Sequence, residues 1–121
     1  MRTPPPLDDR DAELDAARSV AVVRLSALDA AVGQLRADRR SDTADDEHDP
    51  EGVTLSAEWA RLEGLRSGAA RDLDEIDAVI ARRRDGVDGI CADCGRSIPI
   101  ERLRARPTAT RCVDCAARAG A

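Results

Sequence analysis

The chain has 121 residues, a formal net charge of −5, and charged side chains at 36% of its positions. It contains one Trp and neither Phe nor Tyr, which excludes a conventional globular core built on large buried aromatic surfaces. The acidic balance argues against a general nucleic-acid binder, which usually presents a strongly basic face, and no apolar run is long enough to cross a bilayer.

Residues 1–6 are expected to form a disordered N-terminus. This stretch, Met1-Arg2-Thr3-Pro4-Pro5-Pro6, contains no apolar segment of the kind that directs a chain into an oxidising compartment. We therefore expect a cytoplasmic protein without a membrane partner.

Residues 7–40 contain no proline and a single glycine, and their apolar residues follow a heptad pattern. One series recurs every seven residues, and a second series is offset from it by three or four. Such a seam predicts a helix that packs on another helix. The first series is Leu7, Leu14, Ala21, Leu28 and Leu35, and the second is Arg18 as its polar member, Leu25 and Val32.

Residues 55–84 repeat this pattern and predict a second long helix. Thr54 or Ser56 could cap its start, and Gly86 follows three arginines as a stop signal. Gly64 and Gly68 either allow close approach of the partner helix or are simply tolerated. The two seam series are Leu55, Leu62, Ala69 and Ile76, and Trp59, Arg66, Leu73 and Ile80.

Two helices of similar length joined by a short polar connector most simply form an antiparallel hairpin. A parallel homodimer through either seam is the alternative, but seams this rich in alanine and arginine would be weak between chains. The predicted fold is mainly α: a monomeric antiparallel coiled-coil hairpin over residues 7–85, followed by a small C-terminal four-cysteine zinc-finger domain over 86–121.

The connector between the helices, residues 41–53, holds six carboxylates and no cation. It therefore forms an acidic tip on the hairpin, and an ordinary solvated turn is the simplest explanation for it. Calcium binding is a lesser alternative, because the segment lacks the spaced ligands of an EF-hand loop. His48 has no cysteine near it and is expected to be a solvent-exposed loop residue.

All four cysteines lie in a C-x2-C-x17-C-x2-C array near the C-terminus. Two such pairs can supply the closed tetrahedral thiolate shell of a structural zinc ion. A closed shell leaves no position for a substrate, and no nucleophile and base are recognisable elsewhere, so we expect no enzymatic activity. Two disulfides are the rival interpretation, disfavoured in the cytoplasm. The predicted ligands of one structural zinc are Cys91, Cys94, Cys112 and Cys115.

The residues around these cysteines closely resemble the DksA/TraR family of bacterial transcription regulators. The matching elements are Cys94-Gly95-x-x-Ile98-Pro99, then Arg102-Leu103-x-Ala105-x-Pro107-x-Ala109, and the closing Cys112-x-x-Cys115. The resemblance covers residues 86–115 and extends to the hairpin before them. Asp88 departs from the pattern, because the family often has an aromatic residue there.

This resemblance implies a regulator that binds RNA polymerase directly, without sequence-specific DNA binding, and inserts its coiled coil into the secondary channel to modulate initiation. The tip aspartates of the family then correspond to Asp46 and Asp49, with Glu51 where the family has alanine. Asp42 and Asp45 have the same spacing, so they and Glu47 are less certain candidates. A DNA-binding zinc-finger protein and a structural coiled-coil adaptor are the alternatives.

Overall fold

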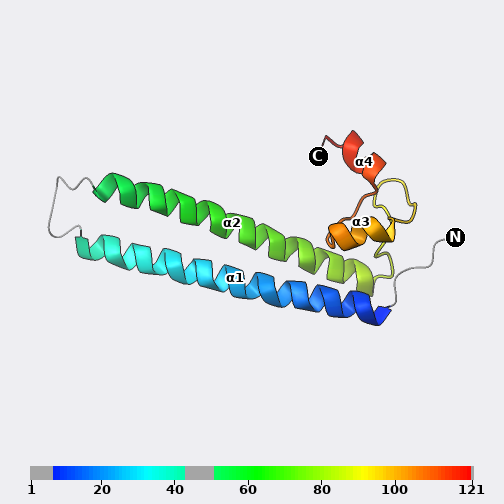
Figure 1. The fold of residues 1–121 in the computed structure, drawn as a ribbon, viewed down its shortest axis with the longest axis horizontal. Coiled ribbons are helices and arrows are strands. Elements are labelled where there is room, and N and C mark those ends of the chain that lie inside the picture. The colour runs from blue at the N-terminus through cyan, green and yellow to red at the C-terminus, as the bar shows by residue number, and fades with distance from the viewer. Residues whose placement is uncertain (1–6, 43–50, 121) are drawn as a thin grey trace. The chain divides into compact units, whose positions relative to one another are not determined.

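The computed structural model describes residues 7–42 and 51–120, with side chains described for 9–40 and 55–120. Four helices account for most of this chain (Figure 1): α1 (Leu7–Asp42), α2 (Glu51–Arg84), α3 (Ile100–Ala105) and α4 (Val113–Arg118). Within the described ranges the β structure is a single antiparallel bridge between Ile90 and Ser97. No helix in these ranges has the length and apolar content to cross a membrane. The predicted fold class, a helical hairpin with a small cysteine-rich C-terminal region, is confirmed.

The chain divides into two compact units. The zinc-finger unit contains the chain up to Arg18 and from Asp74 onward, and the helical unit contains Ser19–Leu73. Both units contain a segment of α1 paired with a segment of α2. The zinc-finger unit adds α3 and α4, so it is assembled from the two ends of the sequence.

In the helical unit, α1 and α2 run antiparallel. Arg24 pairs with Asp72 and Asp29 pairs with Arg66, so positions later in α1 meet positions earlier in α2. The apolar seam between them is centred on Val32, Leu35 and Leu62. Partly buried side chains complete this cluster: Leu28, Ala31, Leu55 and Trp59. The predicted antiparallel pairing and the seam role of Trp59 are therefore confirmed.

Trp59 also has two cations over its ring. The guanidinium carbons of Arg36 and Arg39 lie 5.3 and 5.9 Å from the ring centroid, within cation–π range. The sequence pattern did not predict this contact.

In the zinc-finger unit the helices are again antiparallel, and Leu14 of α1 and Ile76 and Val79 of α2 are buried. Arg18 pairs with Asp77 and Arg83 with Asp11 along the edges of this contact. Arg18 and Arg66, predicted as polar seam members, instead flank the seam with exposed side chains. A flanking position lets the guanidinium remain in water while it reaches a carboxylate on the other helix.

The helix ends differ in part from the prediction. Helix α1 extends to Asp42 and α2 begins at Glu51, so Thr54 and Ser56 lie inside α2 and do not cap it. The end of α2 is as predicted: Gly86 has φ +77° and its N–H donates to the Arg83 carbonyl at 3.1 Å.

Gly64 and Gly68 of α2 do not mediate close helix approach. A Cβ built on Gly64 or Gly68 would meet no described atom within 4 Å. These glycines are tolerated in the helix, which settles the choice left open by the sequence.

Candidate metal centre

The first cysteine pair lies on a tight turn. The Cys91 N–H donates to the Arg96 carbonyl at 2.8 Å, and the Gly95 N–H donates to the Cys91 carbonyl at 3.1 Å. Gly95 has φ +75°, a left-handed conformation that glycine adopts without steric cost. This turn directs the Cys94 N–H to within 3.5 Å of the Cys91 sulfur, in the manner of a knuckle that stabilises a thiolate.

The second cysteine pair lies at the start of α4. Cys112 immediately precedes the helix and Cys115 lies within its first turn. The Ala92 N–H donates to the Thr110 carbonyl at 2.8 Å, which joins the two cysteine-bearing segments directly. The two cysteine pairs are therefore held near each other by a backbone hydrogen bond as well as by any metal that their sulfurs bind.

The four cysteine sulfurs lie within 4.8 Å of one another. The Cys94 and Cys112 sulfurs are 3.8 Å apart, far beyond a disulfide bond, and all four cysteines are free. A tetrahedral zinc ion with Zn–S bonds of about 2.3 Å would place its ligand sulfurs roughly 3.8 Å apart. The donor set and its spacing therefore fit one structural zinc, and the described thiols do not support the disulfide alternative.

The electrostatics of the cluster also suit a cation. Hydrogen bonds from the backbone N–H groups of Cys94 and Cys112 lower the pKa of Cys91 to about 6, against the opposing effect of burial. Hydrogen bonding with the Cys112 thiol and burial raise the pKa of Cys115 to about 12. Without a cation the cluster thus favours one thiolate and resists full ionisation, whereas a bound zinc ion deprotonates its thiol ligands.

A small apolar cluster supports the cysteines. Ile98 and Leu103 are buried with Cys91 and Cys115, and Ala109 packs against them. Leu103 comes from α3 and also approaches Gly89, where an added Cβ would lie 3.8 Å from its Cδ1 atom. So few apolar side chains make a small core, and we expect metal coordination to supply much of the stability of this region.

Charged groups to which the sequence analysis gave no role lie beside this region. Arg10 of α1 is buried and pairs with Asp88, which also pairs with Arg83. Two signals pointed to them: Arg10 falls three residues after Leu7 and four before Leu14, a seam position, and Asp88 replaces an aromatic residue of the family pattern.

The predicted tip residues lie largely outside the described chain. Asp45, Asp46, Glu47 and Asp49 fall in residues 43–50, and Asp42 is the last residue of α1 with no described side chain. Their role stays a prediction.

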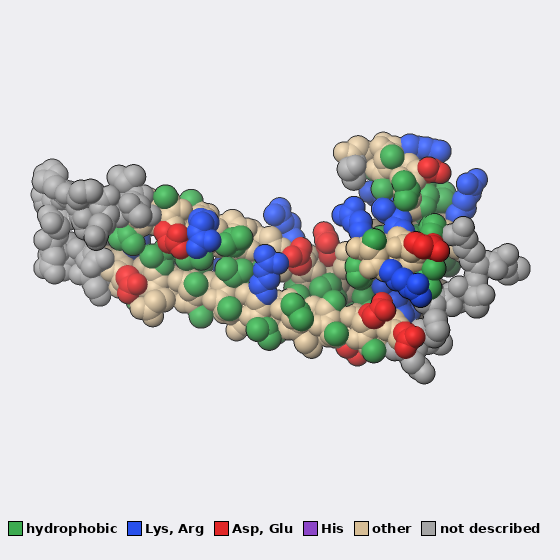
Figure 2. Space-filling model, viewed as in Figure 1, with side chains coloured by type: hydrophobic (Ala, Val, Ile, Leu, Met, Phe, Trp, Pro, Cys, Tyr) green, Lys and Arg blue, Asp and Glu red, His purple; other side chains and the backbone are tan. Residues whose placement is uncertain are grey.

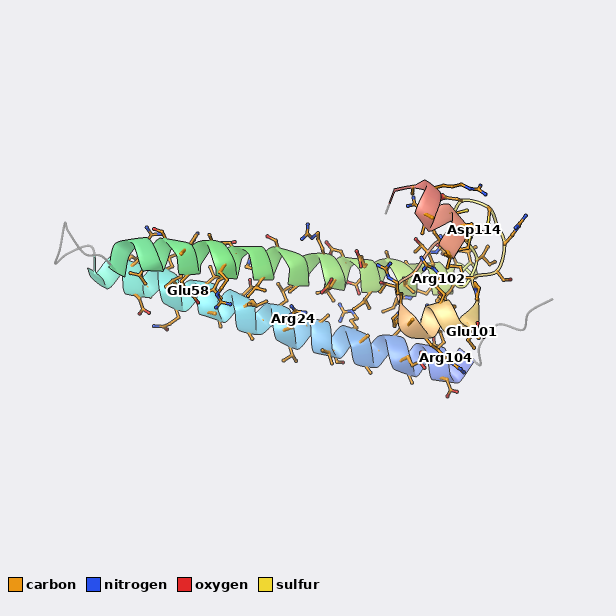
Figure 3. The ribbon with its side chains drawn as sticks, turned by 45° about the horizontal axis from the view of Figure 1, so that its top comes forward. Arg24, Glu58, Glu101, Arg102, Arg104 and Asp114 are labelled. Carbon is orange, nitrogen blue, oxygen red and sulfur yellow. The ribbon has the colours of Figure 1, made fainter. Side chains whose placement is uncertain are left out.

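Arginines are prominent on the surface that carries α3 and α4 (Figure 2). Arg102 donates to the Arg111 carbonyl at 2.8 Å, and Arg111 pairs with Asp93 at 2.9 Å. Arg104, labelled with Arg102 on α3 in Figure 3, and Arg96 have no ion pair within the described ranges. These arginines are thus partly used within the fold and partly exposed.

Comparison with known proteins assigns the C-terminal region. Residues 89–119 match the family model described as the prokaryotic dksA/traR C4-type zinc finger. An uncharacterized protein from Haemophilus influenzae is 48% identical over 42 residues, which cover 35% of this chain and 49% of that protein. The RNA polymerase-binding transcription factor DksA of Escherichia coli is 42% identical over 43 residues, 36% of this chain and 28% of that protein.

The fold comparison extends over more of the chain. The structure of transcription factor DksA2 from Pseudomonas aeruginosa superposes with a TM-score of 0.59 and 25% identity, covering 90% of this chain and 84% of that one. The sequence matches span half or less of the curated relatives, whereas the structural match includes the paired helices. The chain is therefore similar to DksA proteins, in sequence at its C-terminal region and in fold over most of its length, and residues 89–119 match a DksA/TraR-type C4 zinc finger.

Proposed function

We propose that this chain is an RNA polymerase-binding transcription regulator that acts without enzymatic activity in the cytoplasm. The observation that carries the proposal is the joint similarity to DksA proteins, in sequence at the zinc finger and in fold over 90% of the chain. The relative's own name states that it binds RNA polymerase. The paired helices would supply the contact surface, and zinc held by Cys91, Cys94, Cys112 and Cys115 would cross-link the finger.

The finer mechanism we propose is insertion of the hairpin into the secondary channel of the polymerase. The acidic connector would then lie near a catalytic centre where metal ions and basic groups interact strongly with added negative charge. Asp46 and Asp49 are the proposed effectors, with Asp42, Asp45 and Glu47 as further candidates. The support for this step is the family resemblance and the concentration of six carboxylates in residues 41–53.

Two experiments test the proposal separately. A pull-down with purified core polymerase, with the secondary channel open or blocked, tests binding and its location. We expect capture that disappears when the channel is blocked. Capture by neither form would contradict polymerase binding, and equal capture by both would contradict the channel.

Replacement of both Asp46 and Asp49 by Asn tests the tip. The change removes two negative charges but keeps side-chain size, so we expect only a modest loss of affinity, because helices and zinc finger supply most of the contact area. The effect on initiation at a sensitive promoter should be much larger. Unchanged transcription with retained binding would reject these two aspartates, and equal loss of both would assign the tip to docking.

A DNA-binding role is a second candidate, favoured by the exposed arginines Arg96, Arg104 and Arg106 of the finger. Helix α3 has six residues and would be about 9 Å long, which is short for an element that reads a major groove. The net charge of −5 also weakens this candidate. Electrophoretic mobility shifts with duplex DNA in the absence of polymerase would favour it.

A further inference from the structure

Arg10 is the one charged residue among the fully buried large side chains of the described ranges, with 2% of its surface exposed. Its Nε and Nη2 atoms donate to the two carboxylate oxygens of Asp88, each at 3.1 Å. Nη2 also donates to the Pro107 carbonyl at 2.8 Å. Arg83 pairs with both Asp88 and Asp11. We refer to Arg10, Asp11, Arg83, Asp88 and the Pro107 carbonyl as the Arg10 network.

Burial makes this network sensitive to the loss of any partner. A buried guanidinium has lost its hydration and is stable only when its donors and its charge are matched. The Asp88 side chain is 8% exposed, and Arg10 Nη1 has no hydrogen-bond partner within the described chain. Burial raises the pKa of Asp88, but hydrogen bonds from Arg10 and Arg83 outweigh it and the pKa is lowered, so Asp88 is ionised at neutral pH.

The contacts of Arg10 fall on both cysteine-bearing segments. Asp88 lies three residues before Cys91, and Pro107 lies five residues before Cys112. One guanidinium from the start of α1 therefore holds the same two segments that the sulfur cluster joins. All of these residues belong to the zinc-finger unit.

We propose that Arg10 is a positioning residue of the metal centre: it anchors both cysteine-bearing segments to the first turns of α1, so that zinc binding and docking of α1 stabilise each other. This inference does not rest on polymerase binding. If α1 docking raises zinc affinity by a given factor, zinc must strengthen α1 docking by the same factor, because coupling between two equilibria is reciprocal. A purely local ion pair would stabilise the fold without making zinc binding and α1 docking depend on each other.

Substitution of Arg10 and substitution of Asp88 should weaken zinc binding by different amounts. Arg10→Met leaves Asp88 paired with Arg83. Asp88→Asn leaves Arg10 as a buried charge with no carboxylate, which is the costlier defect. The combined Arg10→Met and Asp88→Asn variant removes that orphaned charge, so it should bind zinc better than Asp88→Asn alone.

The test measures zinc affinity of the full chain by competition with a chromogenic chelator. We expect Asp88→Asn to weaken zinc binding on the order of tenfold or more, the effect usual for groups that support metal ligands, and Arg10→Met to weaken it severalfold. Arg10→Lys should resemble Arg10→Met, because an ammonium cannot reproduce the forked contact. Arg18→Met is the control: its pair with Asp77 joins α1 to α2 in the same unit but has exposed side chains (47% and 46%), so zinc affinity should stay within about twofold.

Amide hydrogen exchange supplies a second measurement. In the parent protein, removal of zinc should increase exchange over residues 11–18 of α1. In Arg10→Met, exchange there should already be high and should change little when zinc is removed. Zinc affinity of Arg10→Met and Arg10→Lys equal to that of Arg18→Met, or α1 exchange that does not respond to zinc, would overturn the proposal even if Asp88→Asn failed to fold.

Discussion

The two units use different means to hold the same pair of helices. In the helical unit the contact is a spread of modest apolar side chains around Val32, Leu35 and Leu62, with ion pairs at its exposed edges. In the zinc-finger unit a small apolar cluster is supplemented by four thiols and a buried arginine.

Because of this difference, the two units should lose stability in different ways. Apolar contacts are roughly additive, so the helical unit should weaken in proportion to the area removed. A metal centre and a buried charge depend on complete partner sets, so the zinc-finger unit should fail abruptly when one partner is lost. Substitution and metal removal can test this contrast in both units.

Zinc removal should cause the largest loss of structure, and that loss should be confined to the zinc-finger unit. Chelation, or Cys94→Ser, should release about one equivalent of zinc and increase exchange across residues 86–120, because metal-binding energy is folding energy in such small sites. The fluorescence of Trp59, in the helical unit, should stay blue-shifted relative to free tryptophan, and most helix content should remain. Purified protein with less than half an equivalent of zinc would contradict the metal assignment, and a red shift of Trp59 would contradict the expectation that the helical unit keeps its packing without zinc.

Substitution in the seam should have an intermediate effect. Leu62 is 8% exposed within the seam cluster, and Leu62→Ala should lower the free energy of unfolding by about 2 to 3 kcal/mol. Leu65, 37% exposed on the same helix, provides the matched control, and Leu65→Ala should cost no more than about 1 kcal/mol. Denaturant titration followed by Trp59 fluorescence measures both. Equal losses would show that the seam is wrongly placed in α2.

The smallest effect is expected at a surface ion pair of the helical unit. The hydrogen bond from Arg61 lowers the pKa of Glu58, more than burial raises it. A carboxyl group with a lowered folded-state pKa stabilises the fold above its ordinary pKa, and this contribution disappears as the pH falls through the folded-state value.

Arg61→Met should therefore raise the pKa of Glu58, measured as the pH midpoint of its NMR titration, toward its ordinary value. The free energy of unfolding at neutral pH should change little. Arg71→Met, which alters another exposed arginine of α2, should leave the Glu58 midpoint in place. An unchanged midpoint in Arg61→Met would show that the pair does not persist in solution.

The sequence predicted most of the helical unit and the composition of the metal centre. Heptad spacing is a direct consequence of helix geometry, so Val32, Leu35 and Leu62 could be assigned to the seam without a structure. Cysteine spacing identified the zinc site in the same way, because two residues between ligands suit a knuckle around one ion. Both predictions depended on local periodicity.

What escaped prediction depends on contacts between distant segments. Arg10 occupies a seam position, but its burial requires Asp88 and Pro107, and no local pattern joins residues so far apart. Val79 is buried although the predicted seam series runs through Ile80, which is only partly buried. The start of α2 at Glu51 was also missed, since an acidic stretch around a proline is equally typical of a turn.

The Arg10 contacts also impose an order of events on a chain made from its N-terminus. Arg10 and Pro107 are 97 positions apart, so the zinc-finger unit cannot close until Pro107 has been synthesised. The helical unit lies entirely within that interval and can pair first. Its formation would shorten the loop that must close afterwards and so reduce the entropy cost of joining the two ends. The first turns of α1 would thus be translated before the helical unit and would acquire their native partners after it has formed.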